Sequence, residues 1–472
     1  QAAIFWAQCC SNFKMIAAPP TSPLLPTLGK AIGLLALLMF GAAVGIYGNL
    51  YGEHVVLMLG TPLLIPLGLL LFVNPRLLFL VLIGTRCALD PILDSARFSA
   101  GFGLGAILNL LVIACAAIIC IQSKKDTLKQ SALLWIFPIL VMFLGASYAP
   151  DIVPALKRLI AFISYFAVFT IGMIFAQENQ LRKLLRIIVL SAILPLIVGV
   201  YQLLTGNLAV EGRLAATFTH PNIYAFYCLL VLVVLLYLHR TRQAVEGAAH
   251  RPFATGMLWL LFILLLGSIV LTQTRSAWVA LILISLIYGA MFSRKILIWM
   301  IVGLLAASML PAVQERIIDL FTGNEMVQYG KLNSFAWRQF IWESGLKWMS
   351  PSHYLLGYGI GGFYEYSTEF FPHSGGYHFG AHNVFVERFF DGGLVAVAAF
   401  AVFFVVQLTK AVKLFQHDRF MALIYMSLIL SYLTLNASDN VVDYLAYNWY
   451  YWVVAGAFYA SAHGIVQRNS SV

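Results

Sequence analysis

The chain has 472 residues, of which 61% are hydrophobic and only 10% are charged, and its mean hydropathy is +0.87. Soluble proteins carry about 25% charged residues, so this composition excludes an ordinary soluble globular protein. The net charge of +10 comes from 29 Lys and Arg residues against 19 Asp and Glu residues. Between apolar segments, such an excess marks membrane topology rather than a nucleic-acid surface.

Apolar runs that are long enough to cross a hydrocarbon core of about 30 Å recur along the chain. They predict an all-α polytopic membrane protein with 12, and up to 14, transmembrane helices. A transmembrane barrel is excluded because its alternating segments of about ten residues are absent. The predicted spans are 31–48, 54–73, 76–92, 102–121, 131–148, 157–176, 185–204, 221–239, 256–272, 275–292, 295–312, 384–409, 420–435 and 447–466.

The basic residues set the predicted orientation. With the N-terminus inside, most Lys and Arg residues fall in cytoplasmic connections, and an even number of spans keeps both termini cytoplasmic. The predicted division is a cytoplasmic segment 1–30, a transmembrane bundle 31–312, a periplasmic loop domain 313–383 and C-terminal transmembrane helices 384–472. In a bacterium, this arrangement places the protein in the inner membrane with its large loop in the periplasm.

Three arginines on the predicted outer side, Arg213, Arg275 and Arg338, do not fit easily as anchors; Arg338 lies in the large loop that is described below. Arg213 lies in EGRLAATFTHPN, where we expect Thr219 to cap a helix that has Pro221 in its first turn. Arg213 fits two roles, a salt bridge to Glu211 or an anion ligand beside a helix start. Arg275 lies in LTQTRSAW between two apolar helices, where a charge costs about 2.5–3.5 kcal/mol and usually has a partner. It is either a snorkelling anchor or an anion ligand.

Other polar residues on the predicted outer side have simpler interpretations. Asp439, Asn440 and Asp443 in NASDNVVDY are able to orient a histidine or bind a sugar, but solvated turn residues are the simpler expectation. Interface anchors or surface charges are expected at Arg86, Arg97, Lys157, Arg158, Arg316, Lys331, Lys347 and Arg388.

The stretch from Pro311 to His382 is the one long segment without an apolar run that could cross a bilayer. Within it, SFAWRQFIWESGLKWMSP predicts an amphipathic helix that carries Arg338 and ends at Ser350-Pro351. Its aromatic residues suit either the bilayer surface or a cap on the bundle. The following LLGYGIGGF lacks the GK[ST] of a P-loop, so it predicts close backbone packing beneath a ligand or lid.

His373, His378 and His382 lie within ten residues of one another. Their spacing on a glycine-containing loop is not that of a helical ligand pair, and no Cys or carboxylate stands at a supporting offset, so we predict no metal and no cofactor. The six cysteines show neither CxxC nor Cys/His metal spacing. His382 directly precedes the helix that re-enters the membrane, which makes it the best candidate for a catalytic base; its alternative role is to cap that helix.

The combination of EGRLxATFxHPN, LTxTRSAW and a late loop that contains WR, LLGYGIGGF and AHNVFVERFFDGGL is similar to the bacterial O-antigen ligase/polymerase superfamily, and within it to the lipopolysaccharide O-antigen ligases. The resemblance covers about residues 130–410. It implies a fold of the membrane glycosyltransferase C type and an inverting, metal-independent glycosyl transfer. The implied donor is O-antigen on undecaprenyl pyrophosphate, and the implied acceptor is a sugar hydroxyl of the lipid A–core oligosaccharide.

Carried over by motif, the resemblance implies that Arg213 and Arg275 hold the donor pyrophosphate, while Arg338 and His382 act in catalysis, His382 as the base. Supporting roles are expected for His220, Asn222, Asn383 and Asp439. The periplasm offers no ATP or nucleotide sugar, so the energy must arrive in the donor itself. Arginine is charged at any working pH and bidentate to phosphate, and histidine takes up a proton near neutral pH.

Other functions remain open at this stage. An O-antigen polymerase or a protein O-oligosaccharyltransferase uses the same donor with another acceptor. A transporter of lipid-linked sugars predicts an internal repeat and broken helices with charges at the membrane midplane. We see no repeat, and the unusual charges gather at the outer helix ends. A non-enzymatic assembly scaffold would leave the arginines and His382 replaceable.

Overall fold

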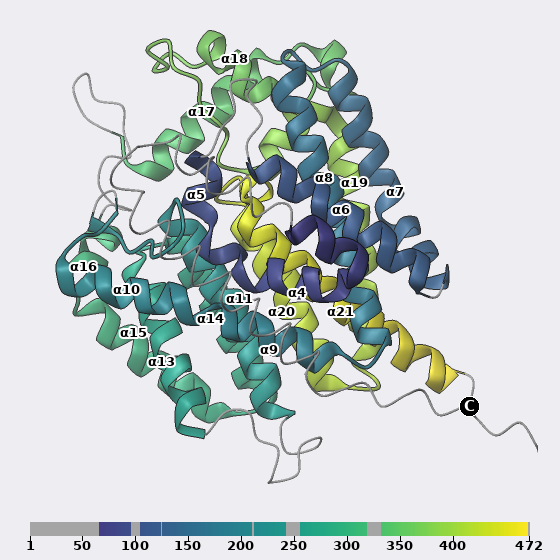
Figure 1. Cartoon of the computed structure of the whole chain (residues 1–472). Coiled ribbons are helices and arrows are strands. Elements are labelled where there is room, and N and C mark those ends of the chain that lie inside the picture. The colour runs from purple at the N-terminus through teal and green to yellow at the C-terminus, as the bar shows by residue number, and fades with distance from the viewer. Residues whose placement is uncertain are drawn as a thin grey trace, which may run out of the picture. The chain divides into compact units, whose positions relative to one another are not determined.

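The structure, a computed structural model, describes residues 66–95, 104–123, 125–209, 212–241, 255–318 and 332–470. Within these ranges all regular secondary structure is helical (Figure 1). The α-helices are α4 (Pro75–Thr85), α5 (Asp90–Ser95), α6 (Leu104–Gln122), α7 (Lys125–Ser147), α8 (Ile152–Gln177), α9 (Leu181–Ser191), α10 (Ile193–Thr205), α11 (Pro221–Arg240), α13 (Thr255–Leu271), α14 (Arg275–Met291), α15 (Arg294–Ser308), α16 (Pro311–Ile318), α17 (Ser334–Trp348), α18 (Gly362–Phe370), α19 (Val384–Leu414), α20 (Arg419–Asn436) and α21 (Leu445–Ser470). Short 3-10 turns are η1 (Arg86–Ala88), η4 (Pro351–His353) and η5 (Val441–Asp443).

Seven helical segments in the described ranges are long and apolar enough to cross a membrane. They are α6, α7, α8, the consecutive pair α9 and α10, α11, α19 and α20. Helices α13 and α14 are also apolar but have 17 residues each. These segments confirm an all-α membrane protein, whereas the count of 12 to 14 spans stays a prediction. The predicted segment 1–30, the first predicted span and most of the second lie outside the described residues.

The predicted span 76–92 is not one helix. Helix α4 ends at Thr85, the chain turns through η1, and α5 begins at Asp90. The Arg86 guanidinium lies buried and pairs with the Asp90 carboxylate at 3.1 Å. A polar pair inside the protein thus replaces the continuous apolar helix that hydropathy favoured.

Helices α8 and α21 form a close crossing at the centre of the core. A Cβ atom on Gly172 would lie 2.1 Å from the Val453 carbonyl oxygen, and one on Gly456 would lie 2.1 Å from that of Phe169. Both positions therefore require glycine, as is typical where membrane helices approach backbone to backbone. Around this crossing, Trp135 packs against Phe403 and Trp452 with ring centroids within 5 Å.

The glycine-rich LLGYGIGGF packs against backbone. A Cβ atom on Gly357 would lie 2.4 Å from the Asp391 carbonyl carbon, and one on Gly359 would lie 2.6 Å from Ala149 Cα. Close packing was predicted, but the partners are α19 and the α7–α8 connection, and none of these glycines lines the cavity described below. The close backbone packing is confirmed, whereas a ligand or lid above these glycines stays a prediction.

The same segment compensates for a break in α19. Gly393 has φ 60° and ψ −160°, which interrupts the helical hydrogen bonds. The Leu394 and Val395 N–H groups instead donate to the carbonyls of Tyr354 and Leu355, at 2.8 and 3.2 Å. Non-helical backbone inside a membrane bundle is tolerated where protein groups satisfy it in this way.

Helix α17 spans Ser334–Trp348 and ends before Ser350-Pro351, as predicted. Its Ile341 packs with Phe363 and Phe370 of α18 and Phe390 of α19 in a small core separate from the main one. In Figure 1, α17 and α18 lie together at one end of the bundle, beside ends of α7 and α8. Of the two placements left open by the sequence, the cap on the bundle is the one that these contacts support.

Candidate active site

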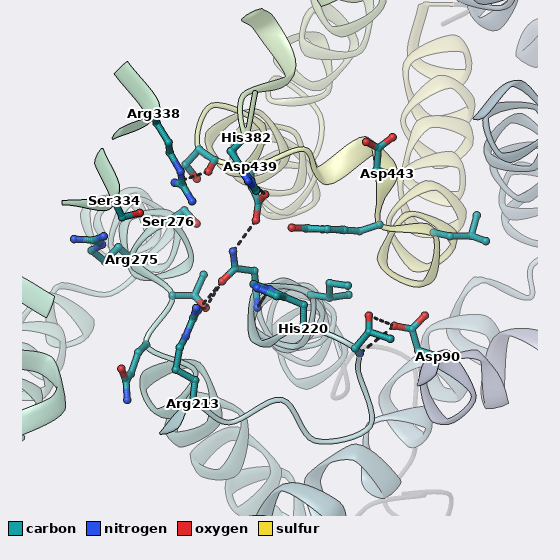
Figure 2. Close-up of a pocket in the computed structure, with 18 of the residues that line it drawn as sticks. Asp90, Arg213, His220, Arg275, Ser276, Ser334, Arg338, His382, Asp439 and Asp443 are labelled. Atoms are coloured by element: carbon teal, nitrogen blue, oxygen red, sulfur yellow. Dashed lines mark hydrogen bonds and ion pairs between the residues drawn. The ribbon is translucent and has the colours of Figure 1, made fainter. Parts of the chain in front are cut away.

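A cavity of about 780 Å³ opens where several helices begin. All four residues predicted for catalysis or donor binding (Arg213, Arg275, Arg338 and His382) line it, although they come from four separate parts of the chain (Figure 2). The full lining is Arg86, Asp90, Leu93, Gly105, Arg213, Thr219, His220, Asn222, Ile223, Gln273, Thr274, Arg275, Ser276, Val279, Arg316, Ser334, Phe335, Arg338, His382, Ser438, Asp439, Asp443, Tyr444 and Leu445.

Several helices start at this cavity. The first residues of α5, α14, α17 and α21 appear in its lining, α11 contributes its N-cap His220 and its second residue Asn222, and α19 begins two residues after His382. A helix start carries a partial positive charge because its first N–H groups have no partner within the helix. The Thr274 side chain does not cap α14, so it accepts no hydrogen bond from the first N–H groups of that helix. The arrangement favours a negatively charged ligand.

His382 is held in a special position at the edge of α19. Its backbone has φ 48°, a left-handed conformation that is uncommon for residues other than glycine and is enriched at functional sites. The next residue, Asn383, caps α19 through its Oδ1, which accepts hydrogen bonds from the Phe385 and Val386 N–H groups. Asn383 is not part of the cavity lining; its contribution is to fix the turn that carries His382.

The His382 ring has a buried carboxylate behind it. His382 Nδ1 lies 3.2 Å from Asp439 Oδ1, with the histidine side chain 43% exposed and that of Asp439 only 1% exposed. The expectation that Asp439 is a solvated turn residue was therefore wrong. Folding across 57 positions of sequence buries this carboxylate against the imidazole.

Asp439 stays ionised because its neighbours favour the carboxylate. Burial alone would raise the pKa of its carboxyl, but the hydrogen bond and charge of His382 and hydrogen bonds from Asn222 and Tyr444 lower that pKa to about 2. Asn222 Nδ2 donates to Asp439 Oδ2 at 2.7 Å, and the Asn440 N–H donates to Oδ1 at 2.9 Å. A fixed anion thus stands behind His382 at neutral pH.

Arg213 is connected to this pair through Asn222. Arg213 Nη2 donates to Asn222 Oδ1 at 2.6 Å and to Thr274 Oγ1 at 3.1 Å, while Nε donates to the Thr272 carbonyl at 2.8 Å. A chain of hydrogen bonds thus runs from Arg213 through Asn222 to Asp439 and His382, and Figure 2 shows how the labelled Arg213, Asp439 and His382 lie around the cavity. The alternative partner Glu211 lies outside the described residues.

Arg275, Arg316 and Arg338 also line the cavity. Arg275 Nη1 donates to the Arg316 carbonyl at 3.4 Å, Arg316 Nε donates to Gln273 Oε1 at 3.2 Å, and Arg338 Nη1 donates to the Ser438 carbonyl at 2.8 Å. Sequence reasoning missed Arg316, which we expected to be an ordinary anchor. The signal that could have found it is its position at the beginning of the large loop, in α16. Because this loop leaves the bundle and returns to it, the two ends of the loop lie close together.

The opposite part of the lining contains a second polar group that the sequence did not reveal. Asp90 Oδ1 accepts from Arg86 at 3.1 Å, and its Oδ2 accepts from the Thr219 N–H at 3.4 Å and hydroxyl at 3.2 Å. Arg86 is buried here rather than a surface charge. Thr219 is thus used by Asp90, and the residue that caps α11 is His220, one position later than predicted.

The other histidines of the large loop lie elsewhere. His373 packs against Phe340 at 5.3 Å between ring centroids, and His378 stacks on Tyr364 at 5.2 Å. Neither lines the cavity. Within the described part of the chain, no group of three or more His, Cys, Asp or Glu side chains is placed to hold a metal ion.

Part of this site lies in a region that is similar to a known family. The family model described as O-antigen ligase matches residues 260–401. The match includes Arg275, Arg316, Arg338 and His382, whereas Arg213 and Asp439 lie outside it. A search of curated proteins gave no match.

Proposed function

We propose that this chain, a member of the O-antigen ligase/polymerase superfamily, transfers O-antigen polysaccharide from undecaprenyl pyrophosphate to a sugar hydroxyl of the lipid A–core oligosaccharide. The transfer is inverting and needs no metal ion. The observation that carries the proposal is the hydrogen-bonded chain in one cavity from Arg213 to His382 through Asn222 and Asp439. It joins a cation suited to phosphate with a base suited to a hydroxyl.

The donor diphosphate suits the charge of the cavity. Five arginines and three aspartates line it, which leaves an excess of positive charge that matches a diphosphate. Guanidinium groups bind phosphate oxygens bidentately and keep their charge at every working pH. As the lipid diphosphate departs, its negative charge grows, and fixed cations in a site shielded from water are usually the largest catalytic contribution. Arg213 and Arg275 hold the diphosphate in this proposal.

The acceptor hydroxyl needs a base, and the contact with Asp439 sets the tautomer of His382. His382 Nδ1–H donates to the ionised Asp439, so the lone pair on Nε2 is available to the substrate. The acceptor O–H gives its proton to Nε2, and its oxygen forms a bond to the anomeric carbon. The bond from that carbon to the phosphate oxygen breaks at the opposite face, and its electron pair leaves with undecaprenyl diphosphate. The anomeric centre is inverted.

We place this site at the periplasmic face of the inner membrane, with both termini in the cytoplasm. The proposal rests on the distribution of basic residues and on the chemistry, because an activated lipid-linked donor supplies the energy where no nucleotide sugar is present. Arg338, which donates to the Ser438 carbonyl beside Asp439, joins the catalytic group from the large loop.

A reaction with purified components tests the proposal. The full chain in detergent or nanodiscs is incubated with undecaprenyl-pyrophosphate-linked O-antigen and rough lipopolysaccharide in EDTA and without ATP. We expect the ladder of O-antigen-bearing lipopolysaccharide on a gel. Parallel reactions replace the acceptor with lipid-linked glycan or with pilin. Growth of lipid-linked glycan would identify a polymerase, glycosylated pilin would identify a protein O-oligosaccharyltransferase, and transfer that depends on added divalent metal would overturn the metal-independent mechanism.

A further inference from the structure

His220 holds a position at the cavity that differs chemically from that of His382. It is the N-cap of α11, with φ −144° and ψ 140°, and its Nδ1 accepts a hydrogen bond from the Asn222 N–H at 3.1 Å. The side chain is exposed and lines the cavity. A neutral imidazole whose Nδ1 accepts a hydrogen bond carries its proton on Nε2. His220 therefore offers an N–H donor, whereas His382 offers a lone pair.

The start of α11 has few other donors to offer. Pro221 has no N–H, the Asn222 N–H is bonded to the His220 ring, and the Ile223 N–H donates to the His220 carbonyl at 3.1 Å. The positive end of the helix thus acts on a ligand through the His220 ring. Arg213, bonded to Asn222 of the same first turn, adds a full charge beside it.

The position of His220 fits the bond that breaks. In Figure 2, His220 lies beside the chain of hydrogen bonds that runs from Arg213 through Asn222 to Asp439. In an inverting displacement, the base and the leaving group stand on opposite faces of the anomeric carbon. With the diphosphate at Arg213 and the incoming hydroxyl at His382, a donor beside this chain, on the same first turn of α11 that Arg213 contacts, can face the phosphate oxygen that is leaving.

We propose that His220 is a further catalytic residue, whose Nε2–H donates a hydrogen bond to the departing phosphate oxygen of the polyprenyl diphosphate. This inference rests on the proposed function. The proton stays on His220, the acceptor proton goes to His382, and the hydrogen bond strengthens as the oxygen gains charge. Arg213 and His220 then form one leaving-group pocket, built on the first turn of α11.

The test separates this role from capping. In His220→Asn, the short amide oxygen is a favoured N-cap and keeps the acceptor for the Asn222 N–H, but no donor reaches into the cavity. His220→Gln restores a longer N–H donor. The matched control is Asp151→Asn, a swap at the N-cap of α8, whose Oδ1 accepts from the Val153 N–H outside the cavity. Melting temperatures of all variants show whether the fold is kept.

Two measurements decide the outcome. With both substrates saturating, we expect His220→Asn to lower kcat on the order of 10²-fold. His220→Gln should recover part of this loss, and Asp151→Asn should leave kcat unchanged. Farnesyl diphosphate, a soluble polyprenyl diphosphate, should bind His220→Asn about tenfold more weakly than the unmodified chain, because a hydrogen bond to a charged group is lost.

The binding measurement does not depend on transfer, so the two proposals fail separately. An unmodified chain that gives no transfer to any acceptor overturns the proposed function. Unchanged farnesyl diphosphate affinity in His220→Asn, or a loss confined to the KM for the acceptor, overturns the role of His220 while the proposed function stands.

Discussion

Two polar clusters hold the start of α19 against the loop between α20 and α21. They differ in whether a side-chain atom remains accessible to a substrate. In the first, His382 contacts the buried Asp439, and its ring is 43% exposed toward the cavity. Each side chain has a fixed partner behind it, and one imidazole nitrogen remains for a substrate. This is the arrangement expected of a catalytic pair, where a buried carboxylate orients a reactive ring.

In the second cluster, carboxylates from both elements share one cation. Arg158 of α8 lies 3.3 Å from Glu387, 4.0 Å from Asp391 and 3.6 Å from Asp443. Asp391 also accepts the Gly361 and Phe363 N–H groups at 2.8 and 2.9 Å, which ties the glycine-rich segment to α19. Here one cation is shared among the carboxylates, although Glu387 Oε2 is buried with no hydrogen-bond partner among the described residues. The same two elements are thus joined once by the pair that we propose for catalysis and once by a cluster that surrounds a shared arginine.

The largest effect is expected at the exposed end of the first cluster. His382→Ala removes the base and should abolish detectable transfer, because no other imidazole in the described lining contacts a buried carboxylate of the described residues. The assay is ligation of O-antigen to rough lipopolysaccharide, with membrane insertion and melting temperature as controls. Near-normal ligation in a folded variant would remove His382 from the mechanism.

Asp439→Asn should lower kcat on the order of 10³-fold or more, because the neutral amide no longer fixes the tautomer of His382. The substitution also tests stability. The lowered pKa of Asp439, about 2 against an ordinary 3.8, corresponds to about 2 kcal/mol of stability. This contribution is present in full above pH 3.8 and is lost as the pH falls toward 2.

We therefore expect the melting temperature of the unmodified chain to exceed that of Asp439→Asn at pH 7, and the difference to shrink below about pH 4. The comparison uses the same detergent at each pH. A difference that persists unchanged at the lowest pH would show that Asp439 stabilises by packing rather than by its charge.

Arg213→Ala and Arg275→Ala should each reduce kcat/KM for the donor on the order of 10²-fold, since each removes a charge at the diphosphate. Lysine at either position should rescue only partly, because it lacks the bidentate fork of arginine. Kinetics at varied donor and fixed saturating acceptor provide the measurement. Unchanged donor use in both alanine variants would make these arginines structural anchors.

The second cluster should respond in stability rather than in chemistry. Arg158→Gln leaves three carboxylates without their shared cation and should cost about 2–3 kcal/mol, seen as a lower melting temperature. The matched surface pair is Lys347 and Glu343, at 3.3 Å with side chains 79% and 65% exposed, where Lys347→Ala should cost less than about 0.5 kcal/mol. Equal losses in the two variants would contradict the anchoring role of Arg158.

Sequence patterns alone determined the class of this protein and the residue types at its site. Apolar runs predicted the helical membrane bundle, the aromatic amphipathic segment predicted α17, and the motifs that resemble the O-antigen ligase/polymerase superfamily are confirmed in residues 260–401. Arg275 stood out because a charge at membrane depth is expensive and usually has a partner. Arg213 and His382 stood out because each precedes a predicted helix start, and Arg338 because it lies on the amphipathic helix of the large loop.

Only the tertiary structure decided which polar groups meet. Asn222 contacts Asp439 across 217 positions of sequence, and no local pattern distinguishes a buried aspartate in NASDNVVDY from a solvated one. The same holds for Arg86 and Arg316, which looked like anchors, and for the glycine-rich segment, whose close packing was predicted but whose partners in α19 and the α7–α8 connection were not. Periodicity and composition indicate how polar or apolar the surroundings of each segment are. The site instead arises where separate helices start at the same point, and that depends on how the helices pack.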